Sequence, residues 1–250
     1  MTLVRLEQRG DTARITLAHP ARCNALTVEL LDDLNAALDR MDSPRAVVLA
    51  AEGRHFSTGG DVARLAAEVA AGNGPAHAAA LVGALNAAIL KLAALHCPVL
   101  ARVQGALTGG ALGLVLAADL VVMTPDAFVQ PWYAAVGFAP DGGWTAMLPA
   151  RIGVQKARAW QMLNTRLVAA DARSLGLADA VTADPDAQID TWLAAILAHD
   201  PGTLADTRRL TTDLPALQAA LEAERAAFVA RVASPGARVG MDRFLTARSA

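Results

Sequence analysis

Three glycine turns and one aspartate are the residues of this chain whose types and spacing could do chemistry. The turns contain Gly59-Gly60, Gly109-Gly110 and Gly142-Gly143, and each separates an extended apolar run from a helical pattern. Glycine lets a ligand approach the backbone closely, and the first amides of a helix lack intrahelical partners and carry partial positive charge. The second turn, at the start of an apolar helix, therefore predicts a site for an anion or for a carbonyl oxygen that gains charge.

Asp141 directly precedes the third glycine pair and has apolar and aromatic neighbours in the sequence. Burial among such neighbours raises the pKa of a carboxyl group, which suits a proton shuttle near neutral pH. An aspartate before two glycines is also common as a helix N-cap or in an Asx-turn. The residues alone leave both roles open.

The stretch Val99 to Asp119 must position the second turn. Its apolar run after Pro98 predicts a buried strand that breaks at Gly105, and the residues after Gly110 predict a buried helix. Because glycines interrupt it and it carries Arg102 and Asp119, a protein core suits it better than a bilayer.

The elements before this stretch are predicted from periodicity. Residues 3–17 alternate around Arg9-Gly10-Asp11 and predict a hairpin, and Thr27 is a plausible N-cap for a helix that ends at Ser43-Pro44. A short buried strand, Ala46 to Ala51, leads into the first glycine turn, after which Asp61 caps a helix. Gly72 to Pro75 predict a mobile break before the next helix, at 81–95.

After Asp119 the pattern changes from mixed to helical. The expected elements are a strand at 120–124, a partly extended segment at 128–136, helices at 144–148 and 154–163, a helix at 171–177 capped by Asp171, and a last strand at 180–183. Beyond Pro185 only amphipathic helices are expected, at 189–198, 204–210 and 214–232. We therefore divide the chain into an α/β part, 1–184, and a helical part, 185–250.

Composition excludes several classes of function. A net charge of −2 gives no reason to expect nucleic acid or an anionic membrane as partner. Cys23 and Cys97 show no metal-binding or redox spacing, and no secretory signal opens the chain, so we expect reduced thiols and a cytoplasmic location. No GxGxxG follows a strand, and neither GK[ST] nor GxSxG occurs, which argues against dinucleotide, P-loop and α/β-hydrolase sites.

Several motifs together resemble the enoyl-CoA hydratase/isomerase (crotonase) family. PVLARVQGALTGGALGLVLAAD looks like the family signature, HFSTGGD like its F-x-x-G-x-D turn, and ARCNAL like its N-A-L segment. GFAPDGG and SLGLAD follow where the family has G-x-x-P-x-x-G-G and A-x-x-x-G-L-V. The matches run in order from Cys23 to Val181, and their combination is specific although each motif alone is weak.

The resemblance implies an α/β protein with the crotonase (ClpP-like) fold, a right-handed superhelix of ββα turns. Residues 1–184 would hold an acyl-CoA site, and residues 185–250 would pack a homotrimer or a dimer of trimers (a hexamer). The expected substrate is an acyl-CoA thioester in fatty acid metabolism. Coenzyme A enters as part of that substrate, and no further cofactor, metal, nucleic acid or membrane partner is expected.

Carried over residue by residue, the family's oxyanion hole falls on the backbone N–H groups of Gly60 and Gly110. Removing a proton beside a thioester, or adding a nucleophile to its double bond, puts negative charge on the thioester oxygen. Fixed donors in a dry site stabilise that charge, and losing one costs about 10²–10³ in rate.

Two departures argue against ordinary hydration. Family hydratases use two glutamates; the first position is Gly113 here, and the second follows Pro131, where this chain has Trp132 and Tyr133. Because the segment from Phe128 to Gly137 is one residue longer than usual, the sequence does not decide which aromatic residue matches the second glutamate.

Asp141 is the carboxylate that stays in a matching place. In similar family members such an aspartate shuttles a proton in enoyl-CoA isomerases, or attacks as nucleophile beside a tryptophan in 4-chlorobenzoyl-CoA dehalogenases. With Gly60 and Gly110 it completes the predicted catalytic set. The residues expected to bind substrate are Arg22, Asn24, Ala25, Leu26, Thr58, Gly109, Gly113, Trp132 and Tyr133.

The favoured hypothesis is an isomerase that moves the double bond of an enoyl-CoA with Asp141 as acid/base. The alternatives are an acyl-CoA hydrolase or dehalogenase, a lyase that hydrates an enoyl-CoA with one carboxylate, and a non-catalytic scaffold that binds CoA or RNA. The chain has only two lysines, Lys91 and Lys156, and this small number argues against RNA binding.

Overall fold

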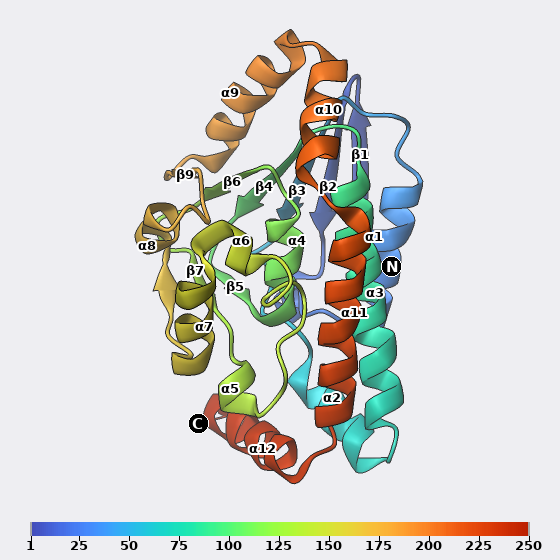
Figure 1. Ribbon diagram of the computed structural model, residues 1–250, viewed down its shortest axis with the longest axis vertical. Helices are drawn as coiled ribbons and strands as arrows, with labels where there is room; N and C mark the ends of the chain where they lie inside the picture. Colours follow the sequence, from blue (N-terminus) through green and yellow to red (C-terminus); the bar gives the residue numbers. More distant parts are fainter. Residues whose placement is uncertain (1, 250) are drawn as a thin grey trace.

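A six-stranded sheet in the order β1-β2-β3-β4-β6-β9 forms the frame of the molecule (Figure 1). The computed structural model describes residues 2–249. β1 and β2 form an antiparallel hairpin, and the other neighbouring pairs are parallel. The strands are β1 (Val4–Arg9), β2 (Thr12–Leu17), β3 (Ala46–Ala51), β4 (Val99–Val103), β6 (Leu120–Met123) and β9 (Ala180–Val181).

A smaller sheet, in the order β5-β7-β8, receives the chain as it leaves β4. It consists of β5 (Ala106–Thr108), β7 (Phe128–Gln130) and β8 (Leu167–Val168). β5 runs straight into the second glycine turn, the 3₁₀ turn η2 (Gly109–Ala111), and then into the buried helix α4 (Leu112–Leu116). The sequence predicts the strand, turn and helix here but misses β5, because three residues are too few to show a period.

The main sheet is buried on both faces, as parallel sheets usually are. Val48, Leu100 and Val122 pack with Ile189 of α9 (Pro185–Ala198) on one face. The residues of these strands that point the other way join the main core: Val47, Leu49, Val99, Ala101, Val121 and Met123.

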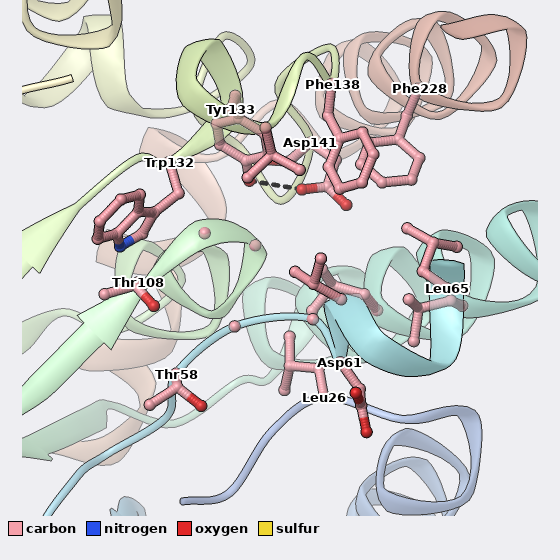
Figure 2. Close-up of a pocket in the computed structure, with 18 of the residues that line it drawn as sticks. Leu26, Thr58, Asp61, Leu65, Thr108, Trp132, Tyr133, Phe138, Asp141 and Phe228 are labelled. Atoms are coloured by element: carbon pink, nitrogen blue, oxygen red, sulfur yellow. Dashed lines mark hydrogen bonds between the residues drawn. The ribbon is translucent and has the colours of Figure 1, made fainter. Parts of the chain in front are cut away.

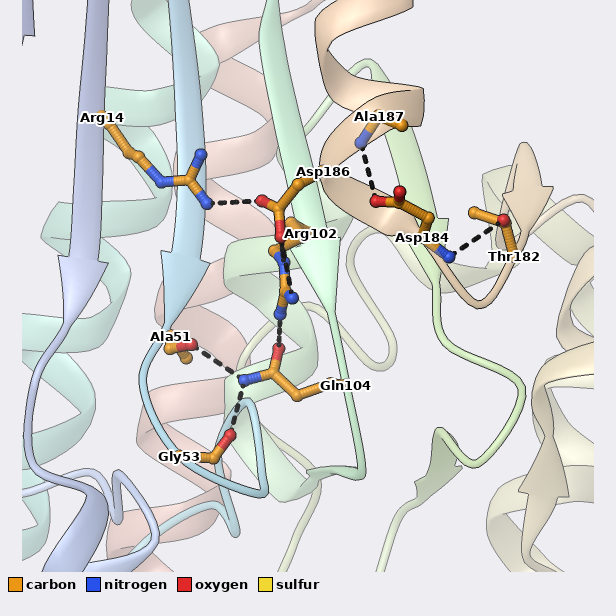
Figure 3. A network of polar contacts seen from close by, with 9 residues as sticks. All are labelled: Arg14, Ala51, Gly53, Arg102, Gln104, Thr182, Asp184, Asp186 and Ala187. Atoms are coloured by element: carbon orange, nitrogen blue, oxygen red, sulfur yellow. Dashed lines mark hydrogen bonds and ion pairs between the residues drawn. The ribbon is translucent and has the colours of Figure 1, made fainter.

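A charged network ties α9 to the sheet and to the loop after β3 (Figure 3). Asp186 accepts hydrogen bonds from Arg14 of β2 at 2.9 Å and from Arg102 of β4 at 3.0 and 3.1 Å. Arg102 also donates to Gln104, whose amide donates to the carbonyls of Ala51 and Gly53 at 2.8 and 3.1 Å. The network therefore fixes the segment from which the first glycine turn departs.

A group of helices packs around α3 (Gly74–Ala94). α3 lies between α1 (Val28–Asp39) and α11 (Leu214–Arg231), and α12 (Pro235–Ser249) crosses below α5 (Tyr133–Val136) and α2 (Val62–Ala70) (Figure 1). α3 is long and apolar enough to cross a membrane, but it packs in the core against these neighbours. The remaining α-helices are α6 (Leu148–Ile152), α7 (Val154–Leu163), α8 (Ala169–Ser174) and α10 (Pro201–Thr211).

The structure confirms two predicted caps and corrects several predicted helix starts; α9 and α10, for example, begin at Pro185 and Pro201 instead of at 189 and 204. Thr27 accepts from Leu30 N at 3.2 Å, and Asp61 accepts from Arg64 N at 3.1 Å. The predicted break at 72–75 is wrong beyond Asn73, because α3 begins at Gly74 and its first turn tolerates a proline. Asp171 lies inside α8, which begins two residues earlier, and residues 144–147 form turns before α6.

We expect Arg208→Ala to destabilise the fold by about 1–3 kcal/mol, since removing this buried guanidinium leaves the backbone carbonyls that it binds without a donor. Arg208 pairs with Asp119 and also donates to the carbonyls of Leu92 and Leu95 at the end of α3, at 2.8 and 2.9 Å. Denaturant unfolding of the variant measures this loss.

The neighbouring variant Arg209→Ala is the control. Arg209 pairs with Asp206 on the exposed surface at 2.9 Å, and such pairs contribute only about 0–1 kcal/mol. Equal losses in the two variants would contradict the role assigned to Arg208.

Candidate active site

The amides of Gly60 and Gly110 have no hydrogen-bond acceptor among the described residues. On either side of Gly60 the backbone is paired: Leu26 N donates to Gly59 O at 2.8 Å and Leu26 O accepts from Asp61 N at 3.2 Å. Gly110 is the second residue of the 3₁₀ turn, where an N–H has no partner within the turn. Both amides are therefore free to bind a ligand.

The two glycine turns lie side by side. Ser57 N donates to Ala106 O at 3.0 Å, and Thr108 N donates to Ser57 O at 3.1 Å. Gly59 has φ +76°, and a Cβ there would lie 2.7 Å from Thr108 O, so only glycine allows this approach. The close approach brings the two free amides to one cavity.

That cavity, of about 70 Å³, lies between the glycine turns and α5 (Figure 2). Gly60 and Gly110 both line it, and Asp141 and Tyr133 lie across it from Leu26 and Thr58 (Figure 2). Its other lining residues are mostly apolar: Leu26, Leu31, Thr58, Gly59, Asp61, Val62, Leu65, Leu81, Leu85, Thr108, Gly109, Pro131, Trp132, Val136, Phe138, Phe228 and Phe244.

Asp141 is buried, with 6% of its surface exposed. The Tyr133 hydroxyl donates to Asp141 Oδ1 at 2.5 Å and lies 3.1 Å from the Asp141 carbonyl oxygen. A Cβ added to Gly110 would lie 3.0 Å from Asp141 Oδ1. The carboxylate is therefore adjacent to one of the two free amides.

Burial raises the pKa of Asp141 to about 7. The hydrogen bond from Tyr133 lowers this pKa, and the charge of Glu224 raises it. Burial and the neighbouring Asp141 raise the pKa of Tyr133 well above its usual value, so its hydroxyl stays protonated as a donor. Asp141 can therefore hold or release a proton near neutral pH, as the sequence predicts.

We expect kcat/KM to fall below about pH 7, because a carboxyl group that acts as a base must be ionised in the free enzyme. The rate should drop tenfold per pH unit on this acidic limb. A pH–rate profile at limiting substrate measures it; a limb near pH 4, the ordinary aspartate range, would contradict this assignment.

Tyr133, and not Trp132, contacts the carboxylate. Trp132 has a left-handed backbone conformation, with φ +67°, and its backbone N–H donates to Asn164 Oδ1 at 2.8 Å. Its ring packs edge-on against Phe244 with centroids 5.3 Å apart, and it forms one end of the cavity (Figure 2). A non-glycine residue in this conformation is strained and persists only where its surroundings hold it, as Asn164 does here.

The predicted substrate-binding residues divide into three groups. Leu26, Thr58 and Gly109 line the cavity with the two aromatic residues. Arg22 lies outside it, in a neighbouring hollow that also contains His19, Arg64 and His77, and pairs with Asp61 at 2.6 Å. Asp61 belongs to both spaces, so the hollow adjoins the cavity.

Asn24, Ala25 and Gly113 do not reach the cavity. Asn24 is fully buried, and its amide accepts from His19 N and donates to the carbonyls of Glu52 and His55, so it fixes the loop. Ala25 is buried beside it. A Cβ on Gly113 would lie 2.4 Å from Gly142 O, so this glycine permits helix packing and leaves no room for substrate.

The aromatic wall formed by Phe138, Phe228 and Phe244 was not predicted from the sequence. The last two belong to α11 and α12, more than 80 residues after Asp141, and no local pattern links them to the site. In the described chain no cluster of histidine, cysteine, aspartate or glutamate could hold a metal ion.

Comparison with known proteins decides the family. The sequence profile described as enoyl-CoA hydratase/isomerase matches residues 7–250. This chain belongs to the enoyl-CoA hydratase/isomerase family. The crotonase fold predicted from the motifs is thereby confirmed, and family members act on acyl-CoA thioesters, so the cavity is the candidate acyl-CoA site.

Two relatives and two solved structures illustrate the family likeness. A 4-chlorobenzoyl coenzyme A dehalogenase of an Arthrobacter species is 32% identical over 80% of this chain and 75% of its own length. A Rhodobacter capsulatus protein named "Probable enoyl-CoA hydratase" is 34% identical over 88% and 86%. An enoyl-CoA hydratase/isomerase structure from Mycobacterium paratuberculosis has TM-score 0.87, 26% identity and 97% and 98% coverage, and a Bacillus halodurans enoyl-CoA hydratase structure has TM-score 0.90, 22% identity and 96% and 99% coverage.

Proposed function

We propose that this protein isomerises the double bond of an enoyl-CoA, with Asp141 as the acid/base. The observation that carries the proposal is the position of one buried carboxylate beside a free amide: a methyl group on Gly110 would lie 3.0 Å from Asp141 Oδ1. A thioester oxygen bound at Gly60 and Gly110 therefore puts its neighbouring carbons within reach of this carboxylate. The second carboxylate of the cavity, Asp61, is held by Arg22 and by the cap of α2.

The reaction needs one proton and no other reagent. Asp141 removes a proton from the carbon next to the thioester of a 3-enoyl-CoA, and the electron pair moves onto the thioester oxygen. The N–H groups of Gly60 and Gly110 stabilise that negative charge in the low-dielectric cavity. The electrons then return, the double bond becomes conjugated with the thioester, and Asp141 gives its proton to the far carbon.

A conversion assay tests the proposal directly. A 3-enoyl-CoA is incubated with the protein, and the conjugated thioester is followed by ultraviolet absorbance. In D₂O the product should carry deuterium, because a carboxyl proton exchanges with solvent. A 3-hydroxyacyl-CoA product would indicate hydration, and free CoA would indicate hydrolysis; either product without the conjugated thioester contradicts isomerisation.

The second candidate is aromatic substitution with Asp141 as nucleophile. It is favoured by the identity to the 4-chlorobenzoyl-CoA dehalogenase and by the cavity wall, which uses five of the ten aromatic residues of the chain: Trp132, Tyr133, Phe138, Phe228 and Phe244. Release of chloride from 4-chlorobenzoyl-CoA separates this reaction from the first. If neither thioester changes but the protein binds both, the role is binding alone.

We further propose a homotrimer or a dimer of trimers. Met162 and Leu163 at the end of α7 are 71% and 72% exposed, and large apolar side chains at the surface favour contact with a second copy. Light scattering after size exclusion measures the mass directly, and a monomer would refute this assembly.

A further inference from the structure

Glu224 is a buried carboxylate that the proposed reaction does not use. It lies on α11 with 4% of its surface exposed, and it is not among the residues that line the cavity. Glu224 takes part in no ion pair between described residues, so no arginine, lysine or histidine among them neutralises its charge. A buried charge without a cation is costly unless hydrogen bonds compensate it.

Among the described residues, the hydrogen bonds to the Glu224 carboxylate all come from the turn that follows Asp141. Oε2 accepts from Gly143 N at 2.8 Å. Oε1 accepts from Thr145 N at 2.6 Å, from Thr145 Oγ1 at 2.7 Å and from Ala146 N at 2.9 Å. Hydrogen bonds from backbone N–H groups to a carboxylate are charge-assisted and roughly twice as strong as neutral ones, so Glu224 holds this turn firmly.

The same turn contacts the oxyanion side of the cavity. Gly142, with φ +60°, lies so close to Gly110 that a Cβ would approach Gly110 O to 2.4 Å. The turn therefore packs against Gly110 on one side and is hydrogen-bonded to α11 on the other. Its position between these two elements sets the position of the Asp141 carboxylate.

We propose that Glu224 is a positioning residue for Asp141, which it places against Gly110 by anchoring residues 143–146 to α11. The proposal rests on the isomerase function for its kinetic consequences, but its structural consequence can be measured without activity. Glu224 also acts through its charge, which disfavours ionisation of the nearby Asp141.

Among the described residues, few charged or titratable groups influence the ionisation of Asp141. Tyr133 of α5 donates to it, Glu224 approaches from α11, and the η2 turn offers only the backbone of Gly110. Asp61 lies across the cavity (Figure 2). Removing the charge of Glu224 should therefore lower the pH at which Asp141 ionises.

Tyr133 provides a direct probe, because it is the only tyrosine of the chain. Labelling with [¹³Cζ]tyrosine gives one resonance, and the ring carbon responds when the Asp141 carboxylate that accepts its hydroxyl gains a proton. In the Glu224→Gln variant we expect the midpoint of this titration to fall by about 0.5–1 pH unit, and the acidic limb of kcat/KM to move with it.

The same variant should lower kcat about 10- to 100-fold with KM changed less than about threefold, because a loosened turn misplaces Asp141 without touching the substrate. Glu222→Gln is the matched control: it removes the same charge from the same helix, where Glu222 pairs with Arg225 in solvent at 2.9 and 3.0 Å. We expect Glu222→Gln to leave the midpoint and kcat unchanged.

Each outcome decides the proposal. A folded Glu224→Gln protein whose Tyr133 titration and kcat match those of the wild type overturns it, as does an equal shift in Glu222→Gln. If Glu224→Gln does not fold, Glu224→Asp keeps the charge but withdraws it by one methylene; an unchanged kcat there would also overturn it. A shifted titration in a protein that isomerises no enoyl-CoA refutes the proposed function and supports the positioning role.

Discussion

Replacing Asp141 with asparagine should lower kcat for isomerisation about 10²–10⁴-fold, the range that a general acid/base contributes. The amide has the shape of the carboxyl group and keeps an oxygen that accepts from Tyr133, which holds Oδ1 at 2.5 Å. It cannot carry a proton between carbons. We therefore expect KM to stay within about threefold of the wild type while the chemical step is lost.

Asp190→Asn is the matched control, because Asp190 is exposed on α9 and does not line the cavity. It should leave kcat unchanged. Steady-state kinetics of both variants on a 3-enoyl-CoA make the comparison, and full activity of the Asp141→Asn protein would remove Asp141 from the mechanism.

Asp141→Asn should increase the stability of the protein although it lowers the activity. The pKa of Asp141 is about 7 in the folded protein, against 3.8 ordinarily, so the folded state binds more protons than the unfolded state between these values. The wild type therefore loses stability as the pH rises through this window, and asparagine avoids that loss. At pH 8 we expect Asp141→Asn to be more stable by up to about 4 kcal/mol, and at pH 4 to show almost no gain.

Gly110→Ala should lower kcat about 10²-fold, the cost of displacing a reacting group by about 1 Å. Its N–H remains, but the new methyl group would lie 2.8 Å from Leu85 Cδ2 and 3.0 Å from Asp141 Oδ1. The leucine tip can move, whereas the carboxylate is held by Tyr133. Either the carboxylate or the bound thioester must therefore shift.

Gly60→Ala separates the effect of crowding from that of substitution itself. A Cβ at Gly60 first meets Leu81 Cδ2 at 3.9 Å, an ordinary contact, and its N–H also remains. We expect a loss of less than about tenfold. Equal losses in kcat for the two alanine variants would contradict the idea that Asp141 stands directly beside Gly110.

Much of the fold could be predicted because its signals are local. The buried strand at 46–51 and the helix at 154–163 are found within one residue of their predicted bounds, since apolar periodicity marks them. The short strands β5 and β8 could not be predicted, because two or three residues show no period and their pairing partners lie 20 to 40 residues away.

The sequence by itself determined the family and the three glycine turns, and it predicted Asp141 as the carboxylate that lies against the second of them. These are local features, in which a bare backbone or a lone acid is needed at one position. Only the tertiary structure decided that Tyr133 and not Trp132 holds Asp141, that Asn24 and Gly113 serve packing, that Glu224 binds the turn after Asp141, and that phenylalanines of α11 and α12 line the cavity. The reason is physical: a hydrogen bond or a cavity wall depends on which segments the core brings together, and that information is absent from the residues next to it in the chain.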